Sequence, residues 1–122
     1  MKFLVEQDNS VVVLSLKEEK LDAQIAGDLK AEFLILCQPN IEALIVNLEN
    51  VSFCDSSGLG ALLLAKRLMN EHGGVVALAS IHENIERLLS ISQIKNQFLC
   101  YGDIVEAMED FRQIEGDDDD DY

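Results

Sequence analysis

Apolar residues gather in short runs along the chain, and polar turns separate the runs. The first two, "KFLVEQ" and "VVVLSL", are separated by the turn sequence "DNS" and predict a β-hairpin over residues 2–16. "IEALIVNL" (41–48) and "VVALAS" (75–80) are almost continuously apolar, the pattern of strands covered on both faces. A short last strand is expected in "NQFLCYG" (96–102).

Helical spacing of apolar residues fills the intervals between these strands. The first helix is predicted to begin at Asp22, a good N-cap residue, and the second to run from Gly58 to about Glu71. Ser80 and Glu83 have the form of a capping box that would start the third helix, and a fourth follows the last strand. Strands alternating with helices predict an α/β fold: a mixed, mostly parallel sheet with an N-terminal hairpin and about four flanking helices.

Length and composition favour one domain of ordinary globular type. The chain has 122 residues, enough for a single core, and 48% of them are hydrophobic. No apolar run reaches the roughly 18 to 20 residues that a membrane span requires, and the N-terminus lacks the pattern of a secretory signal. We therefore expect a cytoplasmic protein without membrane insertion.

The charge is strongly negative and unevenly distributed. The net charge is −14, and six of the 23 acidic residues lie in the tail, 115–122, which leaves 17 acids against nine bases in the body, residues 1–114. An acidic body repels nucleic acid phosphates, so a DNA or RNA partner is not expected, whereas a partner protein with a basic face would be attracted. The tail is a low-complexity acidic run, and we expect it to be disordered and outside the domain.

The cysteines and histidines do not form a recognisable site in the sequence. Cys37, Cys54 and Cys100 are widely spaced and odd in number, as expected for reduced thiols in a cytosolic domain. With only His72 and His82 besides them, no zinc-type spacing is present. We predict no metal site and no cofactor.

The stretch "VSFCDSSGLGALLLAK" (51–66) lies where a parallel strand is expected to end, the usual place for a site in such sheets. A catalytic serine there would need the pattern G-x-S-x-G, but Cys54 stands two residues before Ser56. His72 is at the far end of the predicted helix, about 20 Å away, so a general base is also missing. "GLG" without a P-loop lysine is weak evidence for a phosphate cradle. We therefore predict that the chain is not an enzyme.

A helix cap explains only part of this stretch. Any of Asp55, Ser56 and Ser57 could cap the predicted helix, which would stabilise it by roughly 1 kcal/mol. Capping does not explain Gly58 and Gly60, because glycine costs up to about 1 kcal/mol relative to alanine inside a helix. The missing side chains indicate close approach by another surface.

The residues Asp55-Ser56-Ser57-Gly58-Leu59-Gly60 resemble the signature of STAS domains, specifically of the single-domain anti-sigma factor antagonists of bacteria. The resemblance extends over about residues 2–114. It implies that Ser56, which directly follows the aspartate, is the residue phosphorylated by an anti-sigma factor that is itself a GHKL-type serine kinase. It also implies that Asp22 belongs to the partner-binding surface.

Two functions are compatible with this resemblance. In the first, the chain binds the anti-sigma factor when Ser56 is unmodified, thereby releasing a sigma factor, and phosphorylation ends the binding; a serine phosphatase would be a further partner. The partner-binding residues are then Asp22, Asp55, Ser57, Gly58, Leu59 and Gly60. In the second, the chain is a binding subunit of an ABC-type transporter or another signalling complex.

The acidic tail gives a first prediction. Deleting residues 115–122 should lower the melting temperature by no more than a few degrees, because a tail outside the fold contributes no packing. Thermal unfolding followed by circular dichroism measures this. A larger loss would show that the tail belongs to the folded domain.

Overall fold

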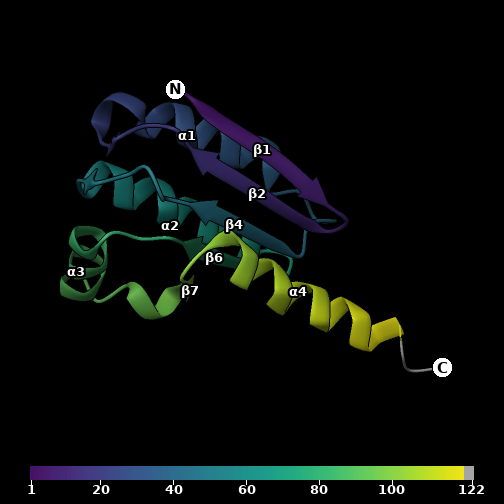
Figure 1. Ribbon diagram of the computed structural model, residues 1–122. Helices are drawn as coiled ribbons and strands as arrows, with labels where there is room; N and C mark the ends of the chain where they lie inside the picture. Colours follow the sequence, from purple (N-terminus) through teal and green to yellow (C-terminus); the bar gives the residue numbers. More distant parts are fainter. Residues whose placement is uncertain (120–122) are drawn as a thin grey trace.

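A five-stranded sheet, with the strand order β1-β2-β4-β6-β7, forms the centre of the molecule. The computed structural model describes the backbone of residues 1–119 and the side chains of residues 1–112. β1 is antiparallel to β2, and every other neighbouring pair is parallel, as predicted (Figure 1). The five strands are β1 (Phe3–Asp8), β2 (Val11–Leu16), β4 (Ala43–Asn47), β6 (Val75–Ala79) and β7 (Leu99–Tyr101).

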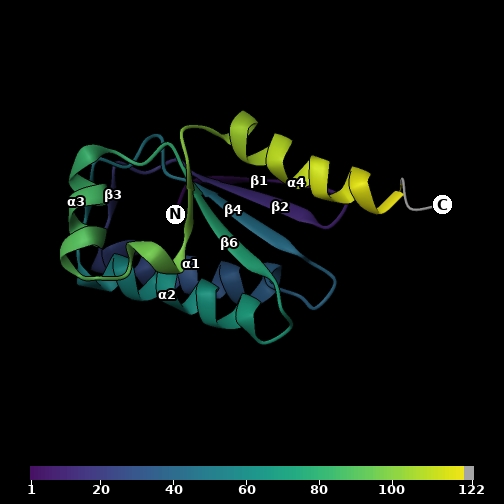
Figure 2. The same cartoon turned by 90° about the horizontal axis from the view of Figure 1, so that it is seen from below.

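Helices cover both faces of this sheet. α1 and α2 lie side by side on one face, and α4 crosses the other (Figure 2). α3 lies beyond the carboxyl ends of the parallel strands, where α1 and α2 also begin (Figure 1). The helices are α1 (Ala23–Leu36), α2 (Ser56–Asn70), α3 (Glu83–Ile91), the short 3-10 helix η1 (Lys95–Gln97) and α4 (Ile104–Asp119).

The central strands are buried on both faces because the sheet is the middle of three layers. Every residue of β4 and every residue of β6 except Val75 is buried, which confirms the prediction from their continuous apolar runs. β2, predicted only as a strand of the hairpin, is buried throughout as well. Alternate residues enter different clusters: Val12 and Leu14 pack toward α1 and α2, whereas Val11 and Val13 pack toward α4.

A second, very small sheet lies beside the first. β3 (Lys20–Leu21) and β5 (Phe53–Cys54) pair in parallel, with Leu21 opposite Cys54. Two-residue strands have no periodicity, and the sequence did not predict them. Their pairing has a direct consequence, because the next residues along the two strands are Asp22 and Asp55.

The predicted helix starts are confirmed at one place and wrong at another. The Asp22 carboxylate accepts a hydrogen bond from the Gln24 N–H at 3.0 Å and caps α1 as predicted. The capping box at Ser80 is wrong: Ser80 has a φ of 57°, and its hydroxyl donates to the Gly102 carbonyl oxygen at 3.2 Å. His82 is the N-cap residue of α3, without a side-chain cap bond.

The last helix continues beyond the boundary that the charge pattern indicated. The Asp103 carboxylate accepts from the Glu106 N–H at 2.8 Å, and the helical backbone runs to Asp119. The expected tail, 115–122, therefore lies partly within α4, and residues 120–122 lie outside the described residues. That the tail is dispensable for folding stays a prediction.

Candidate functional site

The amino ends of α1 and α2 lie together at the carboxyl edge of the sheet. β3 leads into α1 and β5 leads into α2, so the pairing of β3 with β5 places Asp22 beside Asp55. The Asp55 N–H donates to the Leu21 carbonyl oxygen at 3.2 Å, and the Asp55 carboxylate accepts from the Gly58 N–H at 3.0 Å. Two carboxylates thus face two positive helix ends, which is a favourable arrangement.

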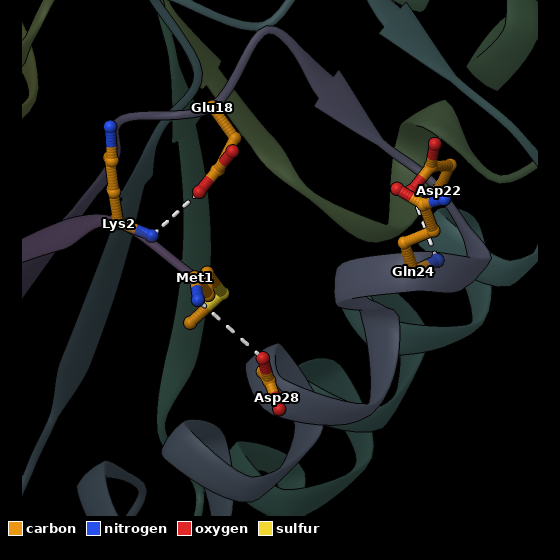
Figure 3. Close-up of polar contacts among 6 residues, drawn as sticks. All are labelled: Met1, Lys2, Glu18, Asp22, Gln24 and Asp28. Carbon is orange, nitrogen blue, oxygen red and sulfur yellow. Dashed lines mark hydrogen bonds and ion pairs between the residues drawn. The ribbon is translucent and has the colours of Figure 1, made fainter.

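The N-terminus of the chain holds the segment that leads to Asp22. The Met1 ammonium lies 3.6 Å from the carboxylate of Asp28 in α1, and the Lys2 N–H donates to the Glu18 carboxylate at 2.7 Å (Figure 3). These contacts tie the start of β1 both to α1 and to the segment after β2.

Gly58 is the point where α2 packs directly on β3. It is buried, and a Cβ atom built there would lie 2.7 Å from the Cys54 Sγ and closer still to the Leu21 carbonyl oxygen. The surface that requires this glycine is therefore the chain's own backbone. Gly60 differs, because a Cβ there would meet no atom within 4 Å.

The two serine hydroxyls differ in accessibility. Ser56, the first residue of α2, is exposed, whereas Ser57 is half-buried. Among residues 1–112, no side chain or backbone group forms a hydrogen bond with either hydroxyl. The Ser56 hydroxyl is accordingly open to another protein, beside the free N–H groups that a helix start provides.

Nucleophilic chemistry has no support in the described part of the chain. His72 Nε2 lies 2.8 Å from the Ile41 carbonyl oxygen, and His82 Nε2 lies 2.8 Å from the Glu49 carbonyl oxygen, so both histidine rings have structural partners. Burial, together with the smaller effect of the negative charge of Asp55, raises the pKa of Cys54 to about 12, so this thiol is protonated at neutral pH.

Residues 1–112 were compared with the requirements of a metal site and of a membrane-spanning helix. No group of three or more histidine, cysteine or acidic side chains in this part could hold a metal ion. Likewise, none of the helices described is long and apolar enough to cross a membrane.

The structure brings the six predicted partner-binding residues and Ser56 to one edge, but it does not expose them equally. Gly58 and Leu59 are buried, whereas Asp22, Asp55, Ser57 and Gly60 are partly accessible. Their role in partner binding stays a prediction.

Sequence reasoning did not predict a depression of about 200 Å³ around Asp22, which is lined by Glu18, Glu19 and one cation, Lys20, among others. The charged residues that line this depression were visible in the sequence as "KEEKLD" (17–22), at the start of the first helix.

The molecule is a small α/β domain with a mixed sheet that begins with a hairpin. It carries an exposed serine at the start of α2, beside two N-cap aspartates. The chain belongs to the STAS domain family, whose model matches residues 2–107. It is 32% identical over 73 residues to the anti-sigma F factor antagonist of Paenibacillus polymyxa; this match covers 60% of the chain and 62% of that protein.

Solved structures agree on the fold. A crystal structure of a Thermotoga maritima protein has a TM-score of 0.80 at 28% identity, covering 90% of this chain and 94% of that one. The anti-sigma factor antagonist SpoIIAA of Bacillus, in its unphosphorylated form, has a TM-score of 0.79 at 23% identity, covering 92% and 97%. The second likeness shows the fold alone.

The two glycines give a matched pair of predictions. Gly58→Ala should destabilise the fold by about 1 to 3 kcal/mol, because the new methyl group must displace the Leu21 backbone. Gly60→Ala should leave stability unchanged or raise it by up to about 1 kcal/mol, because alanine is the better helix former and space is available. Urea unfolding of both variants measures this. Equal stabilities would contradict the packing described for Gly58.

The half-buried thiols of Cys37 and Cys54 predict a loss of stability at alkaline pH. Burial raises the pKa of Cys54 to about 12 and that of Cys37 to about 11, from an ordinary value of 9.0. The unfolded chain therefore loses these protons first, and stability should fall as the pH rises from about 9 through the raised pKa values. The drop in melting temperature between pH 8 and pH 10.5 should be smaller in Cys54→Ala than in the wild type. The same drop in both proteins would contradict this.

Proposed function

We propose that the chain is a partner-switching regulator controlled by phosphorylation of Ser56. With Ser56 unmodified, its surface binds an anti-sigma factor that is a GHKL-type serine kinase, and a sigma factor is released. Phosphorylation of Ser56 by that kinase ends the binding, and a serine phosphatase restores it.

The observation that carries the proposal is the exposed Ser56 hydroxyl at the start of α2, beside the capping residue Asp55. A curated relative named as an anti-sigma factor antagonist supports it.

The position of Ser56 explains how one phosphate can change binding without changing the fold. A phosphate adds about −1.5 to −2 charges and three acceptor oxygens. The start of α2 tolerates this, because its free N–H groups and the positive end of the helix dipole favour an anion. Because Ser56 is exposed, the phosphate displaces no packed side chain of the domain.

The surroundings of Ser56 make the added charge unfavourable for a bound partner. Asp22 and Asp55 lie at the same edge, and Glu18 and Glu19 adjoin Asp22. A partner matched to this surface faces a hydroxyl and must desolvate the phosphate that replaces it, which costs free energy. The phosphorylated surface is therefore a poor match for the same partner, and no catalysis by this chain is needed.

Mass spectrometry tests the site of modification. Incubation with the cognate anti-sigma kinase and ATP should add one phosphate to the wild type and to Ser57→Ala, and none to Ser56→Ala. Phosphate on Ser57 would contradict the assignment. No phosphate on either serine, with any serine kinase encoded nearby in the genome, would favour the alternative, a binding subunit of a transporter or another signalling complex.

Titration calorimetry tests the effect of charge at Ser56. Ser56→Asp carries one negative charge and should bind the kinase more weakly by about 1 to 3 kcal/mol, with a normal melting temperature. Ser56→Ala is the matched control and should retain the affinity of the wild type. Equal affinities of Ser56→Asp and the wild type would contradict the proposed switch.

A further inference from the structure

A groove of about 590 Å³ lies along the outer surface of α2, next to α1. Three of its side chains are cations: Lys30 from α1, and Lys66 and Arg67 from α2. Its lining contains no acidic residue, and the remaining residues that line it are Gly60, Leu63, Leu64, Asn70 and Gln97.

This concentration of positive charge is unusual in a chain with a net charge of −14 and only nine lysines and arginines. Arg87, Lys95 and Arg112 each form an ion pair with a carboxylate. By contrast, the three cations of the groove form no ion pair with any residue in the part of the chain whose side chains are described. Their charges are therefore available to an outside partner.

The groove also presents apolar surface. Leu63 and Leu64 line it. Leu34 follows Lys30 by one helical turn on the same face of α1 and is 57% exposed. Leucine side chains between cations suit an amphipathic protein segment, because burying them on binding is favourable.

A free phosphate compound fits this groove less well. Phosphate sites commonly use the unpaired N–H groups at a helix start. Here the groove runs along the side of α2, where backbone N–H groups bond within the helix. A phosphate could be held only by flexible side chains, those of the three cations and the amides of Asn70 and Gln97.

The groove is continuous with the site at Ser56. Gly60, Leu63 and Arg67 follow Ser56 by four, seven and eleven residues, so all four lie on one face of α2. Asp22, Glu18 and Glu19 lie beside the Ser56 end of this face, and the Arg67 end is basic. A partner that covers the whole face must be basic where it meets Asp22 and acidic where it meets Arg67.

We propose that the groove binds an acidic, amphipathic segment of the anti-sigma partner and thereby sets the orientation in which that partner meets Ser56. This inference rests on the proposed function. It adds that binding depends on charges about three helical turns away from the phosphorylated residue. It also implies that the partner places negative charge on the groove although this chain is acidic overall.

A pair of charge reversals tests the proposal. Arg67→Glu should weaken binding of the cognate anti-sigma factor about tenfold or more and reduce its salt dependence. Arg112→Glu makes the same change in net charge on α4, across the sheet (Figure 2), and should leave the affinity within about twofold. Equal effects of the two variants would overturn the groove proposal and leave the proposed function standing.

A measurement without the partner completes the test. In NMR titrations, a synthetic amphipathic peptide of glutamate and leucine should shift the amide signals of Gly60, Leu63 and Arg67, and tripolyphosphate should not. Shifts with tripolyphosphate alone, or with neither probe, would overturn the proposal. Peptide binding to the groove in a chain that binds no anti-sigma factor would support an acidic ligand for the groove, but it would reject the proposed function and the anti-sigma factor as that ligand.

Discussion

The contact between the Leu21 carbonyl oxygen and Gly58 constrains the whole candidate site. A side chain at residue 58 would push α2 away from β3, because a Cβ there would overlap the Leu21 carbonyl. The Asp55 N–H bonds to the same carbonyl at 3.2 Å, so the start of α2 is fixed at two points. This fixed helix start determines where the Ser56 hydroxyl lies relative to Asp22.

The surface that results lies on a well-packed core and is varied in charge. Leu29 of α1 and Leu62 of α2 are fully buried in one core between these helices and the sheet, so the two helices hold their relative positions. Across their outer face, the acids near Asp22, the hydroxyl of Ser56 and the cation of Arg67 follow one another. The net charge of −14 is a sum over the whole chain and does not show this local distribution of charge. In the proposed switch, a charge added at Ser56 changes this surface while the packed core beneath it stays in place.

Sequence reasoning predicted the features that follow from local pattern. The hairpin, the buried central strands and the N-cap at Asp22 each have a signal within a few neighbouring residues. The pairing of β3 with β5 and the groove at Lys30 have no such local signal, because each depends on segments at least 30 residues apart. Gly58 was recognised as unusual, but only the fold shows that the surface near it is internal.

The most direct test of a surface switch on a fixed scaffold is an NMR comparison of the chain before and after phosphorylation. Changes in amide chemical shift should be confined to the start of α2 and the neighbouring residues around Asp22, with β2, β4 and β6 unchanged and the melting temperature within a few degrees. Shift changes spread through the central strands would contradict this, because they would mean that the phosphate acts by rearranging the fold.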